Sequence, residues 1–268
     1  MTKKILVIPD VHGRRFWKKP VEKYIDTVDR VVFLGDYLDP YDDEEVDYQP
    51  DDVFQNWLDI IKVKMDNRDK VVLLKGNHDE HYSSWVFRRM AGGTRMDARN
   101  WSRNHEVFNN LKDLFQLAHL EEVNGIPYVF THAGLTVYWL NKVNKDIWHL
   151  PDNEVSVADP DIIERINLLD ADDEGQLALS VVGRNRTWGG GEETGSVLWA
   201  DFFEHTVPAP ETYGLNKVFQ VFGHTRLFGE MDDKIQSKNL AMIDSQRCFV
   251  IDNGGIKSLP KPSPREGC

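Results

Sequence analysis

Residues 4–13 read KILVIPDVHG, an apolar run that reaches a proline and then continues into polar residues and a glycine. The apolar part, Ile5 to Pro9, is too short for a membrane span or for the apolar region of a signal peptide. A short run that ends in this way is typical of a strand buried on both faces. We therefore predict a buried strand here, followed by a polar loop.

Two more runs rich in valine and leucine follow, Arg30 to Leu34 and Lys70 to Leu74, and each reaches a polar cluster that contains glycine. Apolar side chains recur at helical spacing after two possible helix caps, Asp51 and Asn104. Strands of this kind that alternate with helices predict an α/β fold with a layered sheet.

The second half of the chain begins with a predicted hairpin, in which Asn124-Gly125 supplies the turn and Tyr128 to Phe130 form the returning strand. Two later apolar runs are Val218 to Phe222 and Cys248 to Ile251. Residues 142–212 are rich in proline, glycine and acidic residues, with one predicted helix, Ile162 to Leu169. We expect one domain over residues 1–268, in which segment 142–212 is an insertion that covers the site.

Composition limits the class of protein. The 268 residues are 41% hydrophobic, enough for a substantial core. The formal net charge of −12 opposes a broad nucleic-acid surface and adhesion to an anionic membrane. Only two cysteines occur, Cys248 and Cys268, which suits a reducing compartment. We expect a cytoplasmic protein.

Five polar clusters lie where apolar runs end, and open α/β sheets bind their ligands at the carboxyl ends of strands. The clusters are Asp10-Val11-His12-Gly13, Gly35-Asp36-Tyr37-Leu38-Asp39, Gly76-Asn77-His78-Asp79, Thr131-His132 and Gly223-His224. Clusters at this recurring place can converge on one crevice although they are far apart in sequence.

The residue types in these clusters are those of a metal centre. Asp10 and His12 are two residues apart, so in an extended segment they point the same way and can hold one ion. Asp36 has two carboxylate oxygens and can bridge two ions. The second ion's ligands would be completed by Asn77, His132 and His224. A mixed oxygen and nitrogen set favours Mn, Fe, Zn, Ni or Co over Ca or Mg.

Taken in order, these motifs resemble the signature of the calcineurin-like metallophosphoesterases, over roughly residues 5–255. Gly-Asp-Tyr-Leu-Asp, together with the later Leu198-Trp199-Ala200-Asp201, is most similar to the phosphoprotein phosphatase branch and its bacterial and phage relatives. The resemblance implies a central β-sandwich flanked by α-helices. It also implies that His78 is the general acid that protonates the leaving oxygen, and that Asp39 orients His78.

The implied metal sites are Asp10, His12 and Asp36 for one ion, and Asp36, Asn77, His132 and His224 for the other. The chain departs from its relatives at three points, one of which is Asp79, where eukaryotic protein phosphatases have a glutamate. Pro40 stands where eukaryotic protein phosphatases have an arginine, so other cations must hold the phosphate; we predict Arg184 and Arg186. Arg226 stands where many phosphodiesterase relatives have a second histidine, which favours the phosphatase branch.

The resulting functional hypothesis is a metal-dependent phosphomonoesterase. It would use two divalent ions, manganese foremost, and a hydroxide that bridges them, with a phosphorylated protein or small phosphoester as substrate. One alternative is a dinucleoside polyphosphate hydrolase similar to the symmetrical diadenosine tetraphosphate hydrolases, and another is a non-catalytic metal-binding scaffold. We interpret the remaining histidines as surface or packing residues; they are His81, His105, His119, His149 and His205.

Overall fold

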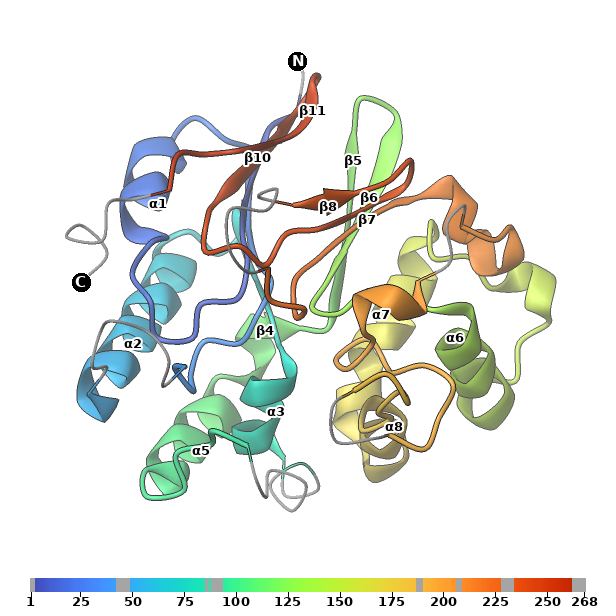
Figure 1. Cartoon of the computed structure of the whole chain (residues 1–268), viewed down its shortest axis with the longest axis horizontal. Helices are drawn as coiled ribbons and strands as arrows, with labels where there is room; N and C mark the ends of the chain where they lie inside the picture. The colour runs from blue at the N-terminus through green and yellow to red at the C-terminus, as the bar shows by residue number, and fades with distance from the viewer. Residues whose placement is uncertain are drawn as a thin grey trace. The chain divides into compact units, whose positions relative to one another are not determined.

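The computed structural model describes residues 3–41, 49–84, 87, 94–186, 190–205, 209–227 and 234–261. Cys268, one of the two cysteines considered above, lies outside these residues. The chain forms two compact units, one made of Met1–Gln116 with Gln246–Cys268 and the other of Leu117–Ser245. The expected single domain with an insertion stays a prediction, and we describe each unit by itself (Figure 1).

Among its described residues, the first unit forms a six-stranded sheet. Its strands are β1 (Ile5–Ile8), β2 (Arg30–Phe33), β3 (Val71–Leu74), β4 (Phe115–Gln116), β10 (Phe249–Asp252) and β11 (Gly255–Ser258). The order is β11-β10-β1-β2-β3-β4; β1 to β4 run parallel, and β10 is antiparallel to β1. The strands predicted at residues 4–9, 30–34 and 70–74 are therefore confirmed.

The register of the parallel strands explains how three of the polar clusters meet. Ile8 of β1 lies beside Phe33 of β2, and Phe33 lies beside Leu73 of β3. The loops that leave these strands therefore begin side by side at one edge of the sheet. The three strands are almost wholly buried, as their unbroken apolar sequences predict.

The helices of the first unit are α1 (Lys18–Tyr24), α2 (Pro50–Asp66), α3 (Asn77–Ser83) and α5 (Trp101–Asn110), counting only described residues. The predicted caps were wrong. Helix α2 begins after Gln49, because Pro50 suits a first helical position, and Asp51 lies in the first turn. Helix α5 begins three residues before Asn104 and ends before β4.

The second unit contains the other sheet. Its strands are β5 (Ala118–Val123), β6 (Ile126–Thr131), β7 (Phe219–Phe222), β8 (Ile235–Gln236) and β9 (Leu240–Met242), in the order β5-β6-β7-β9-β8. Asn124 and Gly125 have φ angles of 55° and 76°, so the predicted tight turn between β5 and β6 is confirmed. Strands β6 and β7 run parallel, so they end at the same edge.

The helices of the second unit are α6 (Val137–Val143), α7 (Pro160–Leu168) and α8 (Asp173–Leu179) among its described residues. Helix α7 corresponds to the helix predicted at residues 162–169, and its true N-cap is Asp159. Segment 142–212 also holds α8, which the sequence reasoning missed because its two large apolar residues, Leu177 and Leu179, are two positions apart and show no helical spacing. The predicted mixed α/β class, with two sheets and flanking helices, is confirmed.

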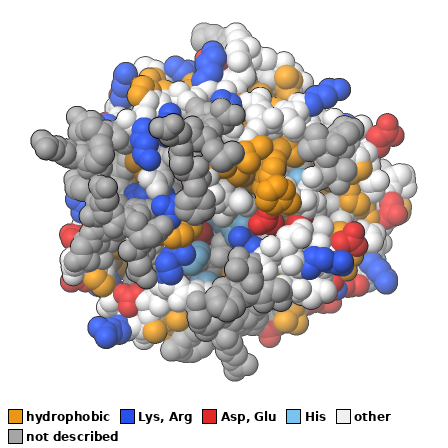
Figure 2. All heavy atoms as spheres, in the orientation of Figure 1, with side chains coloured by type: hydrophobic (Ala, Val, Ile, Leu, Met, Phe, Trp, Pro, Cys, Tyr) orange, Lys and Arg blue, Asp and Glu red, His pale blue; other side chains and the backbone are white. Residues whose placement is uncertain are grey.

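On the face shown in Figure 2, acidic and basic side chains of the described residues are interspersed. None of the described helices is both long enough and apolar enough to cross a membrane.

Candidate functional site

The loops after β1 and β2 bring together Asp10, His12 and Asp36. One ligand atom from each of these side chains lies within 4.8 Å of the others. All three residues are buried, with relative exposures of 1%, 1% and 2%. Two buried carboxylates beside an imidazole would repel each other and lack solvation, and a divalent cation between them would remove that cost. The donor set thus fits a transition-metal ion.

The orientation of His12 supports this interpretation. Its Nδ1 lies 3.0 Å from the Leu38 carbonyl oxygen and 2.9 Å from that of Asp39, so Nδ1 carries the proton and donates it. Its Nε2 faces Asp36, 3.3 Å from Oδ2. Burial, and then the nearby charges of His78 and two arginines, hold the pKa of His12 well below its usual range. The neutral ring therefore offers a free Nε2 lone pair to an ion.

The backbone of these loops is strained at the residues that carry the chemistry. His12, Asp36 and Asp39 have φ angles of 46°, 52° and 59°, and His224 of the second unit has 67°. Side-chain-bearing residues rarely adopt this left-handed region, and such residues cluster at functional sites. Gly76 has a different task, because a Cβ at this position would overlap Oδ1 of Asp36.

Asp79 fastens two of the loops together. Its Oδ2 accepts hydrogen bonds from the backbone N–H groups of Gly76 at 2.8 Å and Asp36 at 2.7 Å, and its Oδ1 accepts that of Tyr37 at 2.9 Å. The sequence suggested only a cap for the following helix. The structure adds a hydrogen bond to the loop that contains Asp36, 43 residues earlier in the chain, and this bond positions Asp36.

We expect Asp79→Asn to lower the free energy of unfolding by about 2–4 kcal/mol, because an amide nitrogen would replace one oxygen and face a buried N–H donor. Urea denaturation followed by tryptophan fluorescence measures the change. The matched control is Asp59→Asn, which removes a partly exposed pair with Lys18 and should cost less than about 1 kcal/mol. Equal effects of the two substitutions would refute the role given to Asp79.

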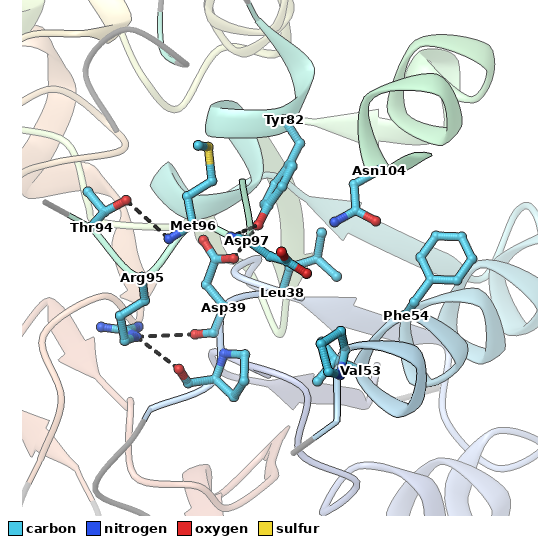
Figure 3. A pocket seen from close by; sticks show the side chains of 12 residues that line it. Leu38, Asp39, Val53, Phe54, Tyr82, Thr94, Arg95, Met96, Asp97 and Asn104 are labelled. Carbon is cyan, nitrogen blue, oxygen red and sulfur yellow. Dashed lines mark hydrogen bonds between the residues drawn. The ribbon is translucent and has the colours of Figure 1, made fainter. Parts of the chain in front are cut away.

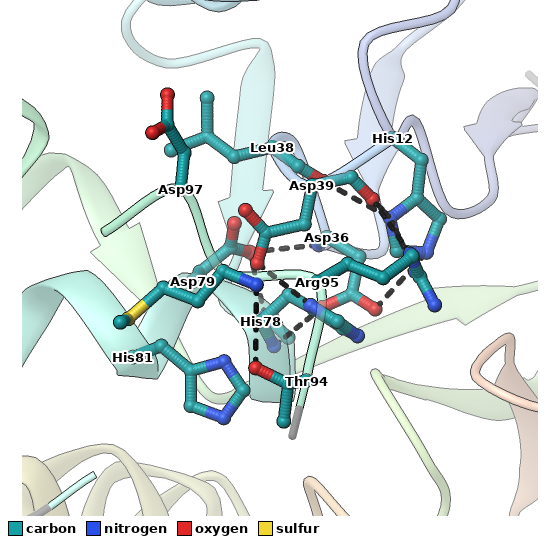
Figure 4. A network of polar contacts seen from close by, with 12 residues as sticks. His12, Asp36, Leu38, Asp39, His78, Asp79, His81, Thr94, Arg95 and Asp97 are labelled. Atoms are coloured by element: carbon teal, nitrogen blue, oxygen red, sulfur yellow. Dashed lines mark hydrogen bonds and ion pairs between the residues drawn. The ribbon is translucent and has the colours of Figure 1, made fainter. Parts of the chain in front are cut away.

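His78 and Asp39 form the second feature of this site. Nδ1 of His78 donates to Oδ2 of Asp39 at 2.8 Å (Figure 4). The hydroxyl of Tyr82 donates to Oδ1 of the same carboxylate. Burial raises the pKa of Asp39 to about 7, while the Tyr82 hydrogen bond and the charge of Arg95 lower it. Both oxygens of the carboxyl are therefore held, and the ring of His78 is fixed with Nε2 turned away from Asp39.

Helix α3 positions three of the residues around this pair. Asn77 is its first residue and is 4% exposed, and the backbone N–H of His78 donates to Oδ1 of Asp36 at 2.9 Å. The ring of His81 lies 5.3 Å from that of His78. Burial lowers the pKa of His81 to about 3, so this ring is neutral.

A cavity of about 270 Å³ adjoins Asp39 on the side of α2 and α5 (Figure 3). Leu38, Val53 and Phe54 give it apolar walls, and Asn104 lies among its polar residues. Its position beside the carboxylate that holds His78 makes it part of the surroundings of the site.

In the second unit, His132 follows β6 and His224 follows β7. Nε2 of His132 lies 2.9 Å from Nδ1 of His224, and the backbone N–H of Gly223 donates to the carbonyl of His132 at 2.8 Å. Nε2 of His205 lies 3.0 Å from the carbonyl oxygen of Ala133, and burial lowers the pKa of this ring to about 4. His205 thus packs against the residue that follows the predicted ligand His132. The sequence analysis had interpreted it as a surface or packing residue. The joining of this pair with Asp36 stays a prediction.

The two arginines predicted to bind phosphate also belong to the second unit. Arg184 is exposed, and Nη1 of Arg186 lies 3.9 Å from Oδ2 of Asp201. Their role stays a prediction.

Sequence reasoning missed two residues near the site, Arg95 and His81, and one buried carboxylate at a strand end, Asp244. Arg95 lies beside His12, with its Nη2 3.5 Å from Nδ1 of that ring. His81 shares a helix face with His78, a spacing of three residues that could have been noticed. Asp244 follows β9, as the other clusters follow their strands, and is fully buried. Arg95 had no such signal, because no motif surrounds it.

The chain is similar to known proteins in sequence and in fold. The sequence model of the family described as calcineurin-like phosphoesterase matches residues 3–225. No curated protein matches the sequence. A protein serine/threonine phosphatase from Saccharomyces cerevisiae, with similarity to human phosphatase PP5, aligns with a TM-score of 0.51 and 14% identity, covering 98% of this chain and 81% of that one. A metallophosphoesterase from Sphaerobacter thermophilus aligns with a TM-score of 0.39 and 13% identity, covering 97% and 89%.

Proposed function

The chain belongs to the calcineurin-like phosphoesterase family, and from this premise we propose that it hydrolyses phosphate monoesters with the help of two divalent metal ions. The proposal rests on one observation: a set of metal ligands and a positioned histidine lie side by side in the first unit. A buried three-ligand set, Asp10, His12 and Asp36, lies next to a histidine that a buried carboxylate holds in place. The first arrangement suits a metal ion, and the second suits an acid.

The chain's own groups have separate tasks in this reaction. As the imidazolium, His78 would donate one proton from Nδ1 to the Asp39 carboxylate and hold the other on Nε2 for the departing oxygen. Tyr82 holds the other oxygen of Asp39, and burial raises the pKa of its hydroxyl, so it remains a donor. When bound, the ions supply an activated water and hold the phosphate oxygens.

The second ion would take Asp36 together with Asn77, His132 and His224. The hydrogen-bonded approach of His132 to His224 supports this, because the two rings already converge. Manganese is the proposed metal for both sites, on the same mixed oxygen and nitrogen donors. The proposed partner is a phosphorylated protein or small phosphoester in the cytoplasm.

A panel of substrates tests the proposal. Purified protein loaded with Mn, Ni, Co, Zn or Mg would be assayed on a phosphopeptide, an alkyl phosphate, a phosphodiester and a dinucleoside tetraphosphate. We expect turnover of the monoesters to exceed that of the others. Preference for the dinucleotide would support the pyrophosphohydrolase instead, and no turnover with any metal would support the non-catalytic scaffold.

A further inference from the structure

Arg95 differs from Arg103 and Arg15 in its charge balance. Arg103 pairs with Asp51 at 2.7 Å, and Arg15 faces Asp52 at 3.9 Å. Among the described residues, Arg95 has no carboxylate partner within ion-pair distance. Asp39 acts on this charge only from beyond ion-pair distance.

The guanidinium of Arg95 is held firmly all the same. Its Nε donates to the carbonyl oxygens of Pro40 at 3.1 Å and Asp39 at 3.3 Å (Figure 3). Its Cζ lies 3.6 Å from the centre of the Tyr41 ring, which favours a cation on its face. Only Nε is used by these carbonyls, so the terminal nitrogens keep hydrogens for another acceptor.

The free end of the guanidinium lies beside His12, one of the predicted metal ligands, on the Nδ1 side of its ring. Nη2 of Arg95 lies 3.5 Å from Nδ1 of His12 (Figure 4), and that nitrogen already donates its proton to backbone carbonyls, so it cannot accept one from Arg95. The Tyr41 ring that carries Arg95 lies 4.8 Å from the His12 ring. Arg14, which is 4% exposed, approaches the same Tyr41 ring at 5.5 Å.

A cation beside a metal site needs an anion to offset the repulsion. A guanidinium with free terminal N–H groups binds two oxygens of a phosphate at once. We propose that Arg95, carried on the Tyr41 ring, binds the phosphate group of the substrate. The proposal deepens the phosphoesterase function and rests on it for the identity of the substrate. It is an alternative to the part that the sequence assigned to Arg184 and Arg186, and the test below includes both.

The test measures binding of inorganic phosphate to the full chain loaded with manganese, by isothermal titration calorimetry. Arg95→Lys keeps the charge and loses the fork, and Arg95→Gln loses both. We expect the dissociation constant to rise about tenfold for the first and about 10- to 100-fold for the second. Metal content and the melting temperature should stay at wild-type values.

The matched control is Arg103→Gln, because Arg103 also lies over an aromatic ring, that of Phe54 at 4.0 Å, but already has a carboxylate partner. This variant should bind phosphate within about twofold of wild type. Wild-type affinity in Arg95→Gln would overturn the proposal, and so would a loss of affinity confined to Arg184→Lys or Arg186→Lys. Loss of bound metal in both Arg95 variants would also overturn it, since Arg95 would then only support the loop.

The two proposals can fail separately. Phosphate binding that depends on Arg95, in a protein that hydrolyses none of the phosphoesters, would contradict the proposed function and leave the assignment of Arg95 standing. Turnover in the wild type with unchanged phosphate affinity in Arg95→Gln would do the opposite.

Discussion

Replacing Asp36 with asparagine should abolish turnover, with a fall in kcat of at least about 10³-fold, because metal-ion catalysis supplies several kcal/mol of transition-state stabilisation. Asparagine has nearly the same shape, but it has one carbonyl oxygen and no charge. Asp36 is predicted to bridge both ions, so the bound metal should fall at both sites at once. Metal analysis of the purified variant, beside the assay, measures this.

The substitution should leave the fold intact. Asp36 has a φ angle of 52°, a left-handed conformation that asparagine also tolerates, and the tie from its backbone N–H to Asp79 remains. Asp59→Asn on the outside of α2 is the control and should keep full activity. Full activity of wild-type protein after removal of its metals with a chelator would contradict the two-metal mechanism.

His78→Ala should separate acid catalysis from metal binding. Bound metal should stay near the wild-type amount, while the rate with an alkyl phosphate falls by about 10²–10⁴-fold, the usual contribution of a general acid. An aryl phosphate with an activated leaving group needs less protonation, so its rate should fall less. Steady-state assays of both substrates, with metal analysis, measure the difference.

His119→Ala is the control for this variant, because His119 pairs with Glu121 on β5, away from the predicted ligands in sequence. It should lose no activity on either substrate. If His78→Ala slows both substrates equally, or loses its metal, His78 is not the general acid.

The fold was predictable where a strand is buried on both faces. Residues 4–9, 30–34 and 70–74 are unbroken apolar runs, and each is a strand. Helix ends were less predictable, because the choice of N-cap depends on the chain before the helix. Asn104 has the right side chain for a cap, yet Trp101 is buried and extends α5 by a turn in front of it.

The convergence of three predicted metal ligands could be predicted from the sequence, but the contact that Arg95 makes with one of them could not. Asp10, His12 and Asp36 are short side chains at the ends of neighbouring strands, so sequence order and parallel register bring them together. Arg95 reaches His12 from 83 positions away through a long side chain, with backbone carbonyls as its partners. No rule of sequence spacing predicts such a contact, because it depends on the three-dimensional fold.

The left-handed backbone at His12, Asp36, Asp39 and His224 has a cost in stability. Each such residue costs about 1 kcal/mol that a glycine would avoid, and the four together cost a sizeable part of the roughly 5–15 kcal/mol by which domains are stable. A glycine at any of these positions would relieve the strain, but it would remove a side chain that the proposed metal sites or the His78–Asp39 pair require. Stability and the chemistry of the site therefore make opposite demands on these four positions.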